Sequence, residues 1–122
     1  MNTITWLLIG HLVGDFVLQN DWMAKGKKNG FFTLPGIVHY ATYSIVLLFF
    51  LFLDGWHGSS ILPYALSAIL IFITHWLLDG TDFIGWWMRF YHQTDMPLVR
   101  LMVDQTFHIL VLVLIAVWVY RW

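Results

Sequence analysis

Four long apolar stretches constrain this chain more than any other feature of its sequence. They lie at about residues 3–18, 37–53, 60–78 and 98–120. Each approaches or reaches the roughly 20 residues that a helix needs to cross the hydrocarbon core of a bilayer. A helix also satisfies all of its own backbone hydrogen bonds, as lipid requires. The sequence therefore predicts an all-α integral membrane protein, with residues 1–122 forming a single four-helix transmembrane bundle.

The composition excludes several other classes of protein. Of the 122 residues, 60% are hydrophobic and 11% are charged, which is more apolar surface than a soluble domain of this size can bury. The net charge is −1 and no basic block is present, so no nucleic-acid partner is expected. The absence of cysteine excludes disulfides and thiolate metal sites. No Lys or Arg precedes the first stretch and no small-residue cleavage site follows it, so we expect a retained helix rather than a signal peptide.

The basic residues predict the orientation in the membrane. Connections are expected at residues 20–35, 54–60 and 80–97. Five of the six basic residues fall on one side of the predicted bundle: Lys25, Lys27, Lys28, Arg89 and Arg100. Only Arg121 lies on the other side. The positive-inside rule makes the basic side cytoplasmic, which predicts a multi-pass protein of the inner (cytoplasmic) membrane with both termini non-cytoplasmic.

The third connection, residues 80–97, contains the stretch GWWMRFYH. Aromatic residues mixed with basic ones are typical of a short segment that lies in the headgroup layer. A loop with interfacial anchors explains the same stretch equally well.

Seven ionisable residues lie within the apolar stretches, all in the predicted cytoplasmic half: His11, Asp15, His39, His75, Asp79, Asp104 and His108. At a rise of about 1.5 Å per residue, their depths are about 2 to 16 Å below the interface. Six of them form pairs four residues apart, and such pairs project from one face of a helix. Gly10 and Gly14 flank the first pair and permit close helix contact.

Each intramembrane Asp costs about 2.5–3.5 kcal/mol at mid-bilayer and therefore needs compensation. Imidazole and carboxylate ligands without thiolate favour a divalent metal, with Zn expected first and Mn or Fe(II) as alternatives. We interpret all seven residues as metal ligands, in one site with supporting residues or in two adjacent sites. Asp15 and Asp79 lie nearest the mouth and are the candidate catalytic bases. Alternatively, the pairs form a polar network that contains no metal.

A weak internal repeat accompanies these pairs. His11 and His75 are 64 residues apart, and so are Asp15 and Asp79. Two helical hairpins related by duplication, with a pseudo-twofold axis along the membrane normal, explain this spacing.

The segments HLVGDFVLQNDWMAKGK, HWLLDG and DQTFHIL, with the isolated His39, resemble the small bacterial and phage membrane proteins grouped as domain of unknown function 3307. More distantly, the His and Asp pattern is similar to membrane-bound metal-dependent hydrolases. That second resemblance implies hydrolysis but does not identify a substrate.

A divalent metal lowers the pKa of bound water toward 7, so the expected function is hydrolysis of a lipid or another small amphiphilic substrate at the cytoplasmic interface. Arg100, one turn before Asp104, can pair with that residue or hold a phosphate. We also expect a cavity on that side, lined by site residues and by Gln19 or Arg100. Because four short helices are few for an independent enzyme, a homo-oligomer surrounded by membrane lipids is expected.

Two other classes of function stay open. Ionisable residues in a bundle also mark the paths of metal or proton transporters and channel subunits. The outer half, with segments such as LLFFLFL, offers no polar station for such a path. The third class is a structural membrane subunit, in which a polar or metal-stabilised core only fixes the helices.

Overall fold

The computed structural model describes residues 1–55, 61–119 and 121, and this part of the chain is helical with no strand. Its elements are α1 (Thr3–Leu12), the π-helix η1 (Val13–Val17), α2 (Asp21–Gly26), α3 (Leu34–Leu53), α4 (Ile61–Asp79), α5 (Phe83–Phe90) and α6 (Pro97–Val119). The all-α prediction is therefore confirmed. The turn predicted at residues 54–60 lies mostly outside the described residues.

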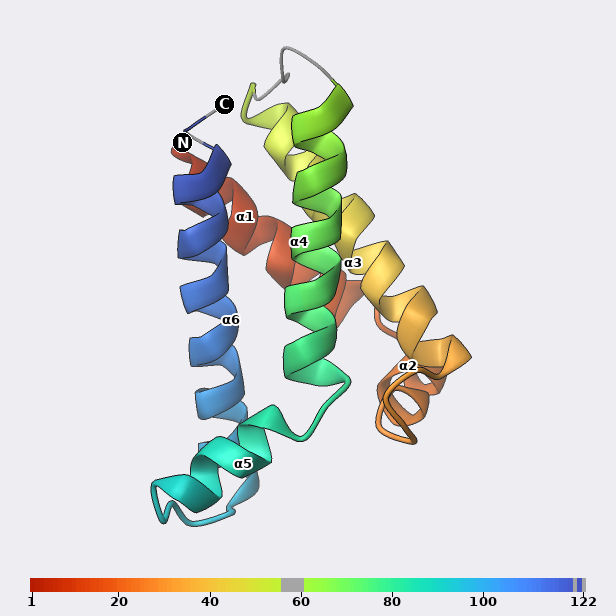
Figure 1. Ribbon diagram of the computed structural model, residues 1–122, viewed down its shortest axis with the longest axis vertical. Coiled ribbons are helices and arrows are strands. Elements are labelled where there is room, and N and C mark those ends of the chain that lie inside the picture. The colour runs from red at the N-terminus through yellow and green to blue at the C-terminus, as the bar shows by residue number, and fades with distance from the viewer. Residues whose placement is uncertain (56–60, 120, 122) are drawn as a thin grey trace.

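Three helices of the described chain, α3, α4 and α6, are long and apolar enough to cross a membrane. Helices α4 and α6 run along the long axis of the molecule, α3 is inclined to them, and α1 lies obliquely behind α4 and α6 (Figure 1). Helix α1 and η1 together form a shorter apolar helix, Thr3–Val17. In the described part of the chain, three helices of spanning length and one shorter apolar helix thus replace the four equivalent spans predicted.

Polar side chains at the helix starts explain where the helices begin. The Asn2 side chain accepts a hydrogen bond from the Thr5 amide at the start of α1. Thr33 accepts one in the same way from the Gly36 amide at the start of α3. Such N-caps satisfy backbone donors that have no partner within the helix. Asn20 caps α2 similarly, so the connection expected at residues 20–35 contains a short helix.

Two glycines let α1 and η1 lie directly against α3. A Cβ atom added at Gly10 would lie 2.8 Å from Leu47 Cδ2, and one added at Gly14 would lie 2.9 Å from Tyr43 Cδ2. Both distances are shorter than real Cβ contacts allow. The predicted role of Gly10 and Gly14 in close helix contact is therefore confirmed.

The two ends of the molecule differ in character. The start of α1 and the end of α6 lie at one end, and α2 and α5 lie at the other, which we call the polar end (Figure 1). The apolar core between them is formed by buried residues of α1, α3, α4 and α6, among them Leu7, Leu47, Leu51, Ile71, Leu112 and Ile115.

Helix α5 confirms a short structured segment in the third connection. Its Met88 packs in a second apolar cluster with α6, and Trp86 and Phe90 are exposed.

Candidate metal centre

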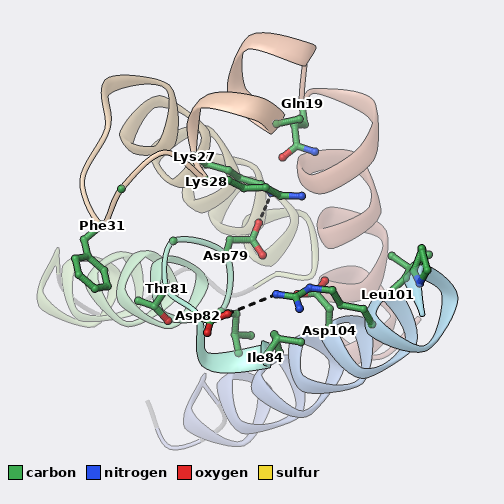
Figure 2. Close-up of a pocket in the computed structure, with 16 residues that line it drawn as sticks. Gln19, Lys27, Lys28, Phe31, Asp79, Thr81, Asp82, Ile84, Leu101 and Asp104 are labelled. Atoms are coloured by element: carbon green, nitrogen blue, oxygen red, sulfur yellow. Dashed lines mark hydrogen bonds and ion pairs between the residues drawn. The ribbon is translucent and has the colours of Figure 1, made fainter. Parts of the chain in front are cut away.

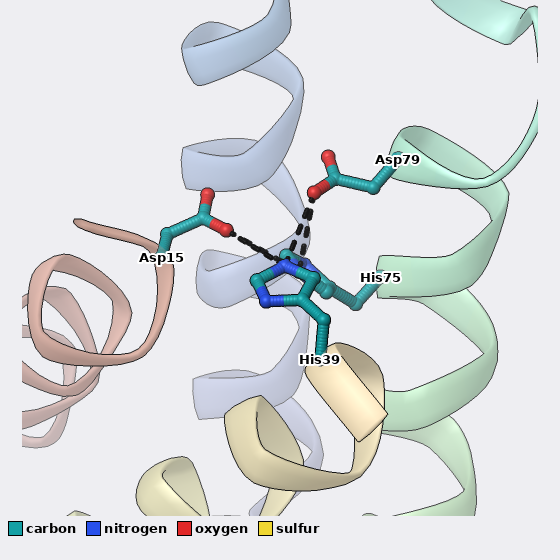
Figure 3. Close-up of side chains that lie close together, drawn as sticks. All are labelled: Asp15, His39, His75 and Asp79. Carbon is teal, nitrogen blue, oxygen red and sulfur yellow. Dashed lines mark hydrogen bonds and ion pairs between the residues drawn. The ribbon is translucent and has the colours of Figure 1, made fainter. Parts of the chain in front are cut away.

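Four of the predicted ligands meet near the polar end, and they come from three elements. Asp15 lies in η1, His39 lies in the second turn of α3, and His75 and Asp79 lie near the end of α4. Their side chains point toward one another (Figure 3). One ligand atom from each residue lies within 4.8 Å of the corresponding atoms of the other three. Helices distant in the sequence thus bring two imidazoles and two carboxylates to one place.

The separations between these ligand atoms match those around a small metal ion. The two Nε2 atoms of His39 and His75 are 2.9 Å apart. Asp15 Oδ1 lies 3.2 Å from the first and 3.4 Å from the second, and Asp79 Oδ2 lies 3.4 Å from both. A tetrahedral shell with Zn–N distances of about 2.0–2.1 Å has edges of about 3.3 Å. Four of the six donor–donor separations, at 3.2–3.4 Å, are therefore those of a tetrahedral site, and the separation of the two imidazole nitrogens is shorter, at 2.9 Å.

Burial makes these groups costly without a cation. His39 is fully buried, His75 is 2% exposed, and the Asp15 and Asp79 side chains are 7% and 6% exposed. Among the described residues, the buried atoms Asp15 Oδ1 and His39 Nδ1 have no hydrogen-bond partner. Asp15 Oδ1 has only its contacts of 3.2 and 3.4 Å with the two imidazoles. Because a buried ionised carboxylate needs compensating charge, the ligand set and this Asp15 oxygen fit a divalent ion.

The π-helix explains how Asp15 reaches this group and why His11 does not. In η1 the Leu18 amide donates to the Val13 carbonyl at 2.9 Å, five residues back, so each turn contains an extra residue. Such segments are frequent at functional sites. His11 and Asp15 keep only a long ion-pair contact, with His11 Nδ1 3.9 Å from Asp15 Oδ2.

His11 lies next to the four-residue group with partners of its own. Its Nδ1 is 3.0 Å from the Tyr43 hydroxyl, and its Nε2 is 3.0 Å from Gln105 Oε1. Its ring lies 5.2 Å from the ring of His108. The structure thus places His11 beside the candidate ligands, while both of its nitrogens contact other side chains.

Asp104 and His108, on α6, form a second group with Asp79. Asp79 belongs to both groups, because its Oδ2 faces His39 and His75 while its Oδ1 lies 3.3 Å from His108 Nε2. Asp104 Oδ2 lies 3.6 Å from His108 Nδ1. All seven predicted residues are therefore in one region, divided between two overlapping groups and the adjacent His11.

A chain of contacts connects His75 to α6. His108 Nδ1 lies 2.9 Å from the Asp104 backbone carbonyl, which can only accept, so this nitrogen carries a proton. His108 Nε2 lies 3.2 Å from His75 Nδ1 and 3.3 Å from Asp79 Oδ1. The Nδ1 of His75 thus contacts α6, while its Nε2 faces the four-residue group. Metal-binding imidazoles are usually oriented by an outer contact of this kind on the other ring nitrogen.

Sequence reasoning did not identify two further residues of this region. Lys27 is 8% exposed, and its Nζ lies 2.5 Å from Asp79 Oδ2. The Tyr43 ring stacks on the His75 ring with centroids 3.6 Å apart and planes 6° apart. Lys27 lies in the run KGKKNG, where only the fold distinguishes it from Lys25 and Lys28. Tyr43 lies one turn after His39, a spacing that could have indicated a shared helix face.

A cavity of about 680 Å³ opens at the polar end and reaches Asp79 and Asp104 (Figure 2). Gln19 and Arg100 also line it, as expected from the sequence. The predicted Arg100–Asp104 pair is not among the ion pairs of the described residues. Arg100 instead lies 3.6 Å from Asp82 and 3.4 Å from Asp95.

Comparison with known proteins identifies one family. A family model described as "Protein of unknown function (DUF3307)" matches residues 3–121, nearly the whole chain. No curated protein and no solved structure gave a match. The more distant resemblance to membrane-bound metal-dependent hydrolases stays a prediction.

Proposed function

The chain belongs to this family of unknown function, and from its site we propose that it is a membrane-embedded, metal-dependent hydrolase of an amphiphilic substrate. Zn is the first candidate for the metal, with Mn or Fe(II) as alternatives. The observation that carries the proposal is the set of five donor–donor separations of 2.9–3.4 Å among four buried side chains from three elements. Ordinary hydrogen-bonded pairs do not require two imidazoles and two carboxylates with ligand atoms all within 4.8 Å of one another.

Hydrolysis requires one coordination position that protein does not fill, whereas a structural zinc site uses four protein ligands. Asp79 is the residue best placed to release such a position. Its Oδ2 already contacts Lys27, and the cavity reaches it. We assign Asp15, His39 and His75 as permanent ligands and Asp79 as an exchanging ligand and general base. A divalent metal supplies Lewis acidity and a more acidic bound water.

The arrangement of charges supports an opening toward the cytoplasm. Five of the six basic residues belong to elements or connections at the polar end, where α2 and α5 lie (Figure 1). By the positive-inside rule this end is cytoplasmic. The cavity then lies level with the headgroups, where an amphiphile can reach it laterally.

The apolar core favours an enclosed site over a transport path. Leu7, Leu47, Leu51 and Leu112 are at most 1% exposed and occupy the interior beyond the candidate ligands. Proton and metal paths need ionisable stations across the membrane. Among the described residues, the ionisable cluster is confined to the half near the polar end.

Metal analysis of protein purified in mild detergent, without chelator and without a His-tag, tests the proposal. We expect one tightly held divalent ion per chain, and ester hydrolysis of an amphiphile that depends on that ion. A well-folded protein that binds no divalent ion after exposure to Zn, Mn and Fe(II) would overturn the proposal.

A metal-free ionic core is the second candidate, favoured by the 2.5 Å contact between Lys27 and Asp79. In that case the Lys27 ammonium is the cation of the cluster, and removing it leaves a buried charge unpaired. Lys27→Met would then cost about 3–5 kcal/mol of stability. If the cluster holds a metal, K27M is expected to retain the ion and much of its metal-bound stability. Metal content and thermal unfolding of the same K27M preparation distinguish the two candidates.

A further inference from the structure

The cavity at the polar end is much larger than an ion or a water molecule requires. Its volume of about 680 Å³ lies within the range of about 300–1,000 Å³ that is typical of small-molecule sites. It lies between the connection that follows α2 and the starts of α5 and α6, with Asp79 among its lining residues (Figure 2). A substrate in this cavity would therefore lie against the candidate metal centre.

The lining combines cationic and apolar side chains. Lys28 contributes from the connection after α2, and Arg100 contributes from the first turn of α6. Phe31, Ile84 and Leu101 provide apolar surface around them (Figure 2). Charge beside apolar surface is the pattern expected for the headgroup region of an amphiphile.

The three acidic residues of the lining have other partners and leave these two cations largely available. Asp79 is paired with Lys27 at 2.5 Å, and Asp82 accepts a hydrogen bond from Arg89 at 2.8 Å. Asp104 Oδ2 accepts a hydrogen bond from Gln105 at 3.1 Å and lies 3.6 Å from His108 Nδ1. That hydrogen bond from Arg89 also holds the pKa of Asp82 below its usual value. Asp82 therefore stays ionised and paired with Arg89 at neutral pH.

Arg100 is held only loosely by its acidic neighbours. Its contacts with Asp82 and Asp95, at 3.6 and 3.4 Å, are longer than the 2.7–2.9 Å or so of a strong charge-assisted hydrogen bond. A guanidinium has five N–H donors in a planar fork, and this fork suits the oxygens of a phosphate. Lys28 is exposed and adds a second positive charge.

We infer that this cavity binds the phosphate group of an amphiphile, with Arg100 and Lys28 as its anion-binding residues. The inference names the substrate class of the proposed hydrolase and rests on that proposal for the reaction, although phosphate binding is measurable without it. A membrane lipid is the expected source, because the apolar lining would be unused by free phosphate.

Calorimetric titration of the full-length protein in mild detergent tests the inference. The probes are dihexanoyl phosphatidic acid, dihexanoylglycerol and inorganic phosphate, each added to chelator-treated protein and to Zn-loaded protein. We expect phosphatidic acid to bind at least tenfold more tightly than dihexanoylglycerol and more tightly than inorganic phosphate. Equal affinity for phosphatidic acid and dihexanoylglycerol would overturn the inference, and a preference for inorganic phosphate would overturn the lipid as its source.

Charge-removing variants locate the binding site. Lys28→Gln and Arg100→Gln are each expected to weaken phosphatidic acid binding about tenfold. Lys25→Gln is the matched control, because Lys25 is exposed on α2 and does not line this cavity. An equal effect of K25Q would indicate general surface electrostatics and would refute the assigned site. Phosphate binding by protein that takes up no metal would support this inference while refuting the hydrolase.

Discussion

Replacing His75 with Gln is expected to abolish tight metal binding without removing the side chain from the core. His75 is the best-connected residue of the candidate centre. Its Nε2 lies within 3.4 Å of ligand atoms of His39, Asp15 and Asp79, and its Nδ1 faces His108. Gln keeps a polar side chain of similar size but removes the imidazole nitrogen that completes the shell.

The magnitude follows from the coordination. Loss of an outer hydrogen-bond partner costs about 10–100-fold in metal affinity, so loss of a ligand is expected to cost at least about 100-fold. At a free Zn concentration of about 100 times the wild-type Kd, bound metal stabilises the wild type by about 2.7 kcal/mol. H75Q would gain about 0.4 kcal/mol under the same conditions. For a domain of this size, the wild-type gain corresponds to a Tm increase on the order of 10 °C.

The assay is thermal unfolding in mild detergent, with free Zn set by a metal buffer and with chelator as the reference. His92→Gln is the control, because it makes the same chemical change at an exposed position outside both candidate groups. H92Q is expected to show the full wild-type shift and H75Q almost none. A Zn-dependent shift of wild-type size in H75Q would refute the assigned coordination.

Three further predictions follow from the geometry. His11→Gln is expected to weaken metal binding by less than tenfold, because both nitrogens of His11 contact residues outside the ligand group. A loss of affinity as large as that of H75Q would show that His11 is a ligand. Gly14→Ala adds a Cβ atom 2.9 Å from the Tyr43 ring, so it is expected to destabilise the protein by about 1–3 kcal/mol and to weaken metal binding. Gly30→Ala is the control, because its added Cβ atom would have its nearest contact at 3.6 Å, and it is expected to have neither effect. In intact cells, a cysteine that replaces Asn2 is expected to react with an impermeant thiol reagent, whereas a cysteine that replaces Lys28 is not. The reverse pattern would contradict a cytoplasmic polar end.

The sequence was sufficient to predict the helices whose length and capping residues are local features. The apolar stretches correspond to α3, α4 and α6, and Asn2 and Thr33 cap the helices that follow them. The short first stretch behaves differently. At 15 residues, Thr3–Val17 is shorter than a full span, and it runs obliquely behind α4 and α6, a placement that no local pattern encodes (Figure 1).

The site was predictable where it depended on helical spacing and depth. His75 and Asp79 share one face of α4, and His39 lies at the same end of the molecule because α3 begins there. The π-helix at Val13–Val17 breaks the assumption of 3.6 residues per turn, and Asp15 joins the four-residue group while His11 keeps only a 3.9 Å contact with it. Lys27 could not be assigned to the site, because it reaches Asp79 across 52 residues of chain.

Lys27 links the metal proposal to the phosphate proposal through a count of charge. Asp15 and Asp79 together carry two negative charges in a buried space, and the Lys27 ammonium compensates one of them. A divalent ion at the four-residue group compensates both. Lys27 would then be a surplus positive charge on the wall of the cavity, where it also belongs to the lining. In surroundings of low dielectric constant such a surplus is unfavourable, and the phosphate of a bound amphiphile neutralises it. For Asp15, Asp79 and Lys27 the divalent ion leaves a net charge of +1, which an anionic phosphate offsets, so each ligand is expected to favour binding of the other.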